Sequence, residues 1–147
     1  MYKHILIPTD GSPTAEKAVE SGLEFAREAG ARVTLFTAVP EYEISEAQML
    51  ARRPIVSIAE HDRRSERRAR EVLAPAEERA RALGVDFDIA FLQSNHPSEA
   101  IVAAARNRDC DAIFMATHGR TGVARLFHGS ETEEVLTHSA IPTLVYR

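Results

Sequence analysis

The chain has 147 residues, of which 44% are hydrophobic and 27% charged, a composition typical of one globular domain over residues 1–147. Its net charge of −4 gives no surplus of positive charge for a polyanion, so nucleic acid is not expected as a partner. No apolar run approaches the roughly 18 residues that cross a bilayer, which argues against a membrane protein. The single cysteine, Cys110, and the absence of a secretory pattern at the start predict a cytoplasmic location.

The N-terminal part of the chain predicts a strand, a helix and a second strand. The apolar run at 4–9 leads to Ser12, a helix-capping residue, and Pro13, which suits a first helical turn. Small and apolar residues then recur at steps of three and four up to Gly30, which suits the end of a helix. Residues 32–39 are rich in β-branched residues without clean alternation, which predicts a strand covered on both faces.

The central part predicts a long helix and a third strand. Residues 40–57 hold two prolines among apolar positions and predict a crossover segment, with a lid or a short extra helix as the alternative. Residues 58–83 have helical periodicity, and their arginine run is interpreted as a solvated face because glutamates are interleaved with it. After Gly84, residues 85–92 alternate in polarity, as in a strand near a sheet edge with one dry face.

The C-terminal part predicts two more helix and strand pairs. Residues 95–108 and 130–139 are helical in pattern, and residues 111–117 and 141–147 read as strands. Strands that alternate with helices need crossover connections, so the sheet should be parallel with helices on both faces. In such sheets ligands bind beyond the carboxyl ends of the strands, where the strand order reverses.

Several common sites are excluded or weakly supported. The only lysines, Lys3 and Lys17, do not follow a glycine-rich phosphate loop, and the first strand-to-helix turn has one glycine where a dinucleotide fingerprint needs three. There is no G-x-S-x-G nucleophile motif, and the six histidines lack the spacing of metal ligands. Cys110 is interpreted as a packing residue without a chemical function.

Residues 115–134, MATHGRTGVARLFHGSETEE, form the remaining candidate site. A strand, a glycine loop and a helix start would bring backbone N–H groups to one point, which favours anion binding. The alternative is a turn that only reverses the chain, with Ser130 as a helix cap and nothing bound. The residues alone leave these two interpretations open.

Three segments of the chain, ILIPTDGS, MATHGRTG followed by HGS, and the terminal IPTLVYR, together resemble the universal stress protein family over essentially the whole length. The resemblance implies a three-layer α/β/α fold with a five-stranded parallel sheet in the order 3-2-1-4-5. This fold is Rossmann-like and similar to that of the adenine nucleotide alpha-hydrolases. It also implies a homodimer formed through the last strand, residues 142–146.

The same resemblance implies a site for ATP or another adenine nucleotide. Asp10 would lie at the ribose and phosphates and is the candidate ligand for Mg2+, whereas Ala38 and Met115 would border the adenine. The loop glycines would hold the phosphates. The full set of implied binding residues is Pro8, Thr9, Asp10, Ala38, Met115, Ala116, His118, Gly119, Arg120, Gly129, Ser130 and Glu131.

The chain departs from the nucleotide-binding pattern of the family at two positions. The pattern is Gly-x2-Gly-x9-Gly-[Ser/Thr], and Gly119, Gly129 and Ser130 fit its second half, but Ala116 replaces its first glycine. Ala116 would be strained if its φ had to be positive. The second departure is Glu131, whose carboxylate would repel a phosphate about 4 Å away by about 4 kcal/mol at an effective dielectric of ~20.

These observations predict a nucleotide-binding stress-response protein with regulatory rather than enzymatic function. No general base is evident, so any ATP hydrolysis is expected to be slow. The alternative is a dimeric interaction module of the same fold that binds no nucleotide. The direction in which the Glu131 carboxylate points separates the two.

Overall fold

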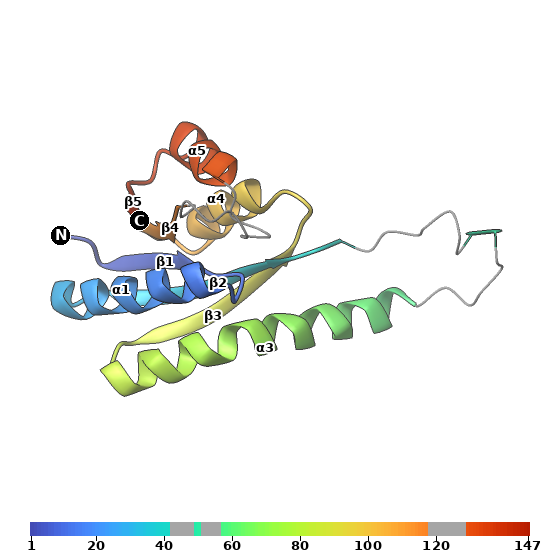
Figure 1. Cartoon of the computed structure of the whole chain (residues 1–147), viewed down its shortest axis with the longest axis horizontal. Helices are drawn as coiled ribbons and strands as arrows, with labels where there is room; N and C mark the ends of the chain where they lie inside the picture. The colour runs from blue at the N-terminus through green and yellow to red at the C-terminus, as the bar shows by residue number, and fades with distance from the viewer. Residues whose placement is uncertain (42–48, 51–56, 118–128) are drawn as a thin grey trace.

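The computed structural model describes residues 1–41, 49–50, 57–117 and 129–147. In the described part, strands and helices alternate along the chain (Figure 1). Of the segment 40–57, for which a crossover or a lid was predicted, most lies outside the described residues. In chain order the elements are β1 (His4–Pro8), α1 (Pro13–Ala29), β2 (Arg32–Val39), α3 (Ile58–Leu83), β3 (Phe87–Gln93), α4 (Pro97–Asn107), β4 (Ala112–Ala116), α5 (Gly129–His138) and β5 (Thr143–Tyr146).

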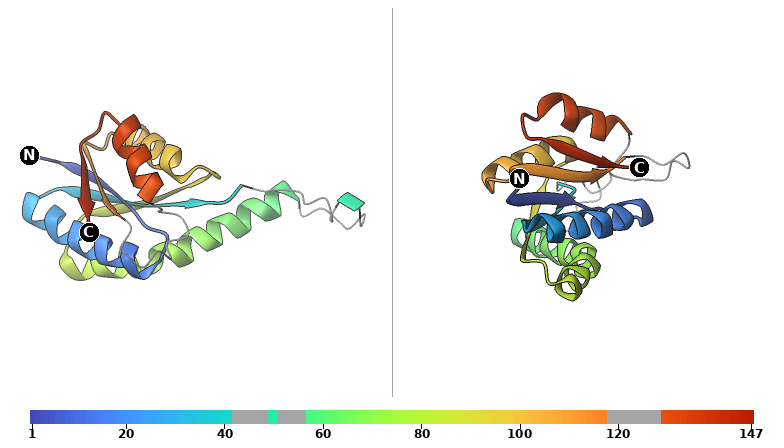
Figure 2. Two further views of the ribbon diagram at one scale, coloured as in Figure 1. Left: turned by 45° about the horizontal axis from the view of Figure 1, so that its top comes forward. Right: turned by 90° about the vertical axis from the view of Figure 1, so that its left-hand side faces the viewer.

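The strands form one parallel sheet in the order β3-β2-β1-β4-β5, which confirms the predicted topology. Helices α1 and α3 cover one face, where α1 packs on β1 and β4 and α3 on β2 and β3. Helices α4 and α5 lie on the other face and pack against each other (Figure 2). The three-layer architecture is therefore the one expected. No described helix has the length and apolar character needed to cross a bilayer.

The helix boundaries follow local capping chemistry. The Ser12 hydroxyl accepts a hydrogen bond from the backbone N–H of Ala15, 3.2 Å away, and starts α1. Ser57 caps α3 in the same way, and Gly30 and Gly84 end the two helices in the left-handed conformation that glycine adopts without a steric cost. Helix α3 continues through Pro75, and its exposed face carries arginine–glutamate pairs four residues apart, which confirms the interpretation of the arginine run.

Strand β3 differs from its prediction in one respect. It does lie at the sheet edge, with Phe87 and Ile89 packed against the core under α3. Its other face was expected to be wet, yet Ala90 on that face is the most buried residue of the strand and is 9% exposed. The reason is that α4 packs on β2 and β3 and shields this row, which an alternating pattern does not reveal.

Helix α1 approaches the sheet closely at Gly22. A Cβ atom built on Gly22 would lie 2.9 Å from Ile7 Cδ1 and 2.9 Å from Phe114 Cδ1, closer than real Cβ atoms lie to their neighbours. The contact joins β1 and β4, the two central strands, to the same helix. Glycine, which has a hydrogen in place of a side chain, is therefore the residue that fits at position 22 without displacing these neighbours.

We expect Gly22→Ala to lower the free energy of unfolding by about 1–2 kcal/mol. An overpacking cost of about 2–3 kcal/mol, in the upper part of the usual range because two buried side chains are met at once, exceeds the gain of about 1 kcal/mol in helix propensity. Urea unfolding followed by circular dichroism measures the change. Glu24→Ala, at an exposed position of the same helix, is the control and should change stability by less than about 0.5 kcal/mol. Equal stability of the glycine and alanine proteins at position 22 would contradict the close packing.

Candidate functional site

The strand order reverses between β1 and β4, and the carboxyl ends of these neighbouring strands form the candidate site. The two strands pair at Ile5 with Ala112 and at Leu6 with Ile113, toward their amino ends. Beyond these pairs β1 runs into the turn before α1, and β4 runs toward α5. The topology therefore brings the two motifs that the sequence singled out to one edge of the sheet.

Thr9 shapes the turn that follows β1. It is fully buried, its backbone N–H donates to the Phe36 carbonyl at 2.8 Å, and its hydroxyl accepts from the Gly11 N–H at 3.1 Å. The same hydroxyl faces Glu16 Oε1 at 3.5 Å. Gly11 has a φ of 78°, a conformation that side chains rarely adopt. Thr9 therefore fixes the turn, while its hydroxyl is already used within the protein.

Glu16 adds an acidic group beside this turn. Burial raises the pKa of Glu16, and the nearby Asp10 acts in the same direction, although Arg79 and the Thr9 hydroxyl partly counteract them. Arg79 donates to the backbone carbonyl of Glu16 and to the carboxylate of Glu20, which joins α3 to α1. In the turn after β1, burial and the neighbouring carboxylates therefore disfavour the charged form of an acidic group.

The Asp10 side chain has one carboxylate oxygen that is not used within the described part of the chain. Its Oδ1 accepts a hydrogen bond from the backbone N–H of Ser12 at 2.8 Å. Its Oδ2 is buried and has no hydrogen-bond partner within the described part of the chain. A buried carboxylate oxygen without a partner is unusual, and a hydroxyl donor or a cation would satisfy it. In the same described ranges no three acidic, histidine or cysteine side chains gather, so a metal there would need oxygens from a ligand as well.

Ala38, Met115 and Ala116 lie at the carboxyl ends of β2 and β4 and are 5%, 1% and 4% exposed. Ala38 and Met115 belong to the core cluster beneath α4 and α5, so they form the base of this edge. Ala116 pairs with Tyr146 as a regular strand residue, and it is not among the described residues with positive φ. Alanine therefore costs no backbone strain at this position.

Thr132 fixes the start of α5 to the end of β4. This side chain is 3% exposed, and its hydroxyl donates to the Ala116 carbonyl at 3.2 Å. The sequence analysis did not select Thr132. Its place two residues after the Gly-Ser pair, on the turn that faces the strand, is the signal that could have found it.

The glycine loop itself lies largely outside the description. His118, Gly119 and Arg120 fall in the undescribed range 118–128. Gly129 and Ser130 form the first turn of α5, close to the predicted helix start, and only their backbone placement is described. The predicted roles of these five residues stay predictions.

Glu131 points its carboxylate at the first turn of α4. Its Oε2 accepts a hydrogen bond from the backbone N–H of Ser98 at 2.9 Å, and the Ser98 hydroxyl donates to Glu134 Oε2 at 2.5 Å. Ser98 is 3% exposed, and the N-cap residue of α4, His96, makes no side-chain capping bond. Helix α5 therefore supplies the acceptor that α4 lacks, and the carboxylates complement the positive end of its dipole.

This link between the helices was not predicted from the sequence. The pattern that could have found it is a pair of glutamates three residues apart on one face of the last helix, opposite a helix that starts without a good cap.

Three comparisons place the chain among known proteins. A family model described as the universal stress protein family matches residues 1–147. A universal stress protein from Thermus aquaticus is 33% identical over the full length of both chains. The solved structure of MJ0577, a universal stress protein of Methanocaldococcus jannaschii, is similar with a TM-score of 0.74 at 28% identity, covering 99% of this chain and 95% of that one. The match over all 147 residues, together with the parallel sheet order, shows that the chain belongs to the universal stress protein family.

Proposed function

We propose that this protein binds an adenine nucleotide, ATP with Mg2+, at the carboxyl ends of β1 and β4 and acts as a regulatory stress-response protein. The observation that carries the proposal is the buried Oδ2 of Asp10, which has no partner within the described residues. It lies directly after β1, beside the point where the strand order reverses.

Other proteins of similar fold support the choice of ligand. Solved universal stress proteins have been described in complex with cAMP, with dAMP and, in Arabidopsis thaliana, with AMP bound. These chains are 24%, 21% and 13% identical to this one, so the likeness itself extends to the fold. The shared chemistry of the three ligands is an adenine, a ribose and at least one phosphate.

In the proposed complex Asp10 accepts from the ribose or contributes one oxygen to Mg2+, and Pro8 and Thr9 contribute backbone groups. Ala38, Met115 and Ala116 provide the apolar base for the adenine. The phosphates are held by the loop and the first turn of α5, through His118, Gly119, Arg120, Gly129 and Ser130. Mg2+, when bound, neutralises part of the phosphate charge.

The position of Glu131 removes the main electrostatic objection to this complex. Its carboxylate accepts from the Ser98 N–H, and the adjacent Ser98 hydroxyl is held by Glu134, so both acids are directed at α4. The repulsion estimated for a carboxylate facing a phosphate therefore does not apply to this geometry.

We propose slow hydrolysis at most. Asp10 is the one carboxylate that the described residues place directly after β1 or β4, and it would be occupied by the ribose or the metal. Efficient turnover needs a second group that activates water.

A cytoplasmic location stays a prediction from the sequence. Burial raises the pKa of the Cys110 thiol to about 11, which agrees with an unreactive packing residue.

We also propose that two copies pair through β5. This short strand is bonded to β4 on one side and forms the sheet edge on the other. Leu144 and Tyr146 pack against the core under α1, whereas Val145 of the same strand and Leu136 of α5 are 36% and 50% exposed. A second copy would cover these apolar side chains and the free strand edge. The same dimer without a nucleotide would be an interaction module, which is the second candidate function.

Millimolar ATP with MgCl2 should raise the melting temperature of the purified protein. At a ligand concentration about 100-fold above Kd the stabilisation is about 2.7 kcal/mol, or roughly 5–10 °C for a domain of this size. Asp10→Asn should lose most of this shift without losing stability in the absence of ATP, because the buried charge is removed as well. Asp86→Asn, at an exposed position, is the control. No shift in the unaltered protein would favour the interaction module.

Glu131→Gln should leave the affinity for ATP within about threefold and lower the free energy of unfolding by about 1–2 kcal/mol. The variant weakens the acceptor for the Ser98 N–H and removes its charge. Calorimetric titration and urea unfolding measure the two effects, and Glu133→Gln on the exposed face of α5 should change neither. A gain of about tenfold or more in ATP affinity would show that Glu131 faces the phosphates in solution.

Light scattering at tens of micromolar should give twice the mass of one chain. Val145→Lys places a charge on the exposed edge strand and should shift the protein to the monomer. Ile58→Lys, at a 77% exposed position far from β5, should remain dimeric. A monomeric mass for the unaltered protein would overturn the proposed dimer.

A further inference from the structure

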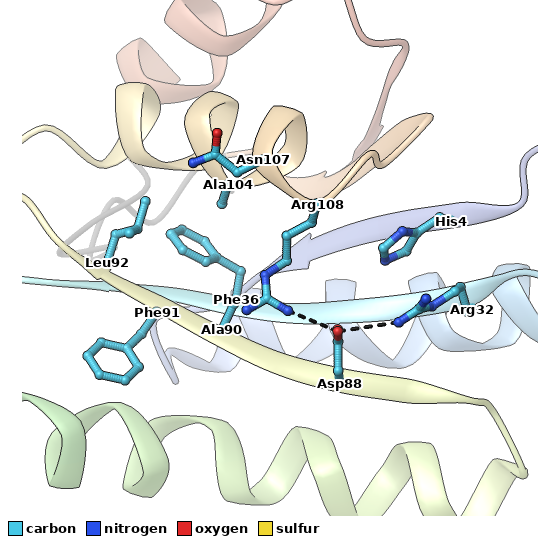
Figure 3. Close-up of a pocket in the computed structure, with 10 residues that line it drawn as sticks. All are labelled: His4, Arg32, Phe36, Asp88, Ala90, Phe91, Leu92, Ala104, Asn107 and Arg108. Atoms are coloured by element: carbon cyan, nitrogen blue, oxygen red, sulfur yellow. Dashed lines mark hydrogen bonds and ion pairs between the residues drawn. The ribbon is translucent and has the colours of Figure 1, made fainter.

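We propose that the groove between α4 and the edge strand β3 binds a small amphiphilic anion, an alkyl chain that ends in a carboxylate. The groove encloses about 520 Å3 and runs along β3 from Asp88 to Leu92, on the face that carries α4 (Figure 3). It is distinct from the carboxyl edge where the nucleotide is proposed, because its polar end lies at the beginnings of β1, β2 and β3. A volume of this size lies within the range of small-molecule sites.

The floor of the groove is apolar, and a small side chain, Ala90, lies at its middle. In the parallel register Phe36 lies beside Ala90, and Leu92 follows two residues further along β3. Ala104 of α4 forms the opposite wall. Phe91, the intervening residue of β3, points away toward α3 (Figure 3). Because alanines line both the strand and the helix, space remains between them that larger side chains would fill.

The polar end of the groove holds two arginines and one carboxylate. Asp88 Oδ2 is 2.9 Å from Arg108 Nη1 and 3.3 Å from Arg32 Nη2, so both guanidinium groups converge on the same oxygen. The other oxygen, Oδ1, accepts from the Thr34 hydroxyl at 2.6 Å. Among the charged side chains that line the groove, one carboxylate thus faces two guanidinium groups, whereas the nearby Asp111 carboxylate is used by the backbone N–H groups of Lys3 and His4.

His4 does not alter this balance. Its Nε2 lies 2.7 Å from the Thr34 hydroxyl, whose own proton goes to Asp88, so Nε2 carries a hydrogen and donates to Thr34. Burial lowers the pKa of His4, and Arg32 lowers it further, although Asp88 and Asp111 act in the opposite direction. The imidazole is therefore neutral near pH 7 and already occupied. Asn107 of α4, beside Ala104, adds an uncharged amide to the lining (Figure 3).

These features together select a monoanion with an apolar tail. Each arginine carries five N–H donors, and the ion pair with Asp88 uses one nitrogen on each, so a second carboxylate can bind without displacing Asp88. The bound carboxylate would pair with the second guanidinium group. An alkyl chain attached to it would lie along Leu92 and remove the partly exposed surface of this side chain from water.

The experiment titrates sodium octanoate into the full chain labelled with 15N and follows the amide resonances. We expect saturable shifts for residues 88–92 and 104–108 at millimolar octanoate. Sodium acetate, which lacks the tail, and octanol, which lacks the charge, should bind at least about tenfold more weakly.

Two variants test separately the contribution of the arginine charge and that of the apolar floor to octanoate binding. Arg108→Gln should weaken octanoate binding about tenfold or more, because a charge-assisted contact is lost, whereas Arg106→Gln, an exposed arginine of the same helix outside the groove, should not. Leu92→Asn keeps the shape of the side chain but makes it polar, and should weaken octanoate binding without changing the response to acetate. Thermal unfolding verifies that each variant is folded.

Three results would overturn the proposal. These are the absence of saturable shifts, equal binding of octanol and octanoate, and equal effects of the substitutions at Arg106 and Arg108. The Arg108 and Arg106 results do not bear on the nucleotide site, because these arginines lie at the opposite end of α4 from the carboxyl ends of the strands.

Discussion

The pairing of β1 with β4 is the constraint on which the rest of the structure depends. It reverses the strand order at the centre of the sheet and brings the carboxyl ends of β1 and β4, which are about one hundred residues apart in the chain, to one edge. The close contact of Gly22 with Ile7 and Phe114 holds both strands against α1. On the opposite face Thr132 ties α5 to the end of β4. The positions of the strand ends that form the candidate site are therefore set by the packing of the core.

The sequence predicted the elements and their order because each signal was local. Capping residues such as Ser12 and Gly30 act within a few residues, and helical or strand periodicity is visible in a short window. The five-stranded order also followed from the family resemblance, and the structure confirms it. For the candidate site, the sequence located Asp10 close after β1 and the start of α5 near residue 130, as the structure has them, because strand and helix ends carry local signals. The binding roles of these residues stay predictions.

What the sequence could not predict depends on contacts between distant elements. The direction of Glu131 is set by Ser98, thirty-three residues earlier, whose N–H lacks a local acceptor. The burial of Ala90 depends on where α4 lies over the sheet. The alternating pattern of a strand does not indicate where a distant helix will pack. The partnerless oxygen of Asp10 is likewise a property of the folded turn, since any aspartate in a turn can find its own partners.

The two ends of the sheet differ in how their carboxylates are satisfied, and this difference links the two proposed sites. At the carboxyl edge Asp10 has one oxygen with a partner and one without, so the protein lacks a donor or cation there. At the amino edge Asp88 accepts from Thr34, Arg32 and Arg108, so two guanidinium groups share one carboxylate there. In the two proposed complexes, a cation bound with phosphates would satisfy Asp10 at the first edge, and a carboxylate would pair with the two arginines at the second. The ligand groups proposed for the two ends of the sheet are therefore opposite in charge.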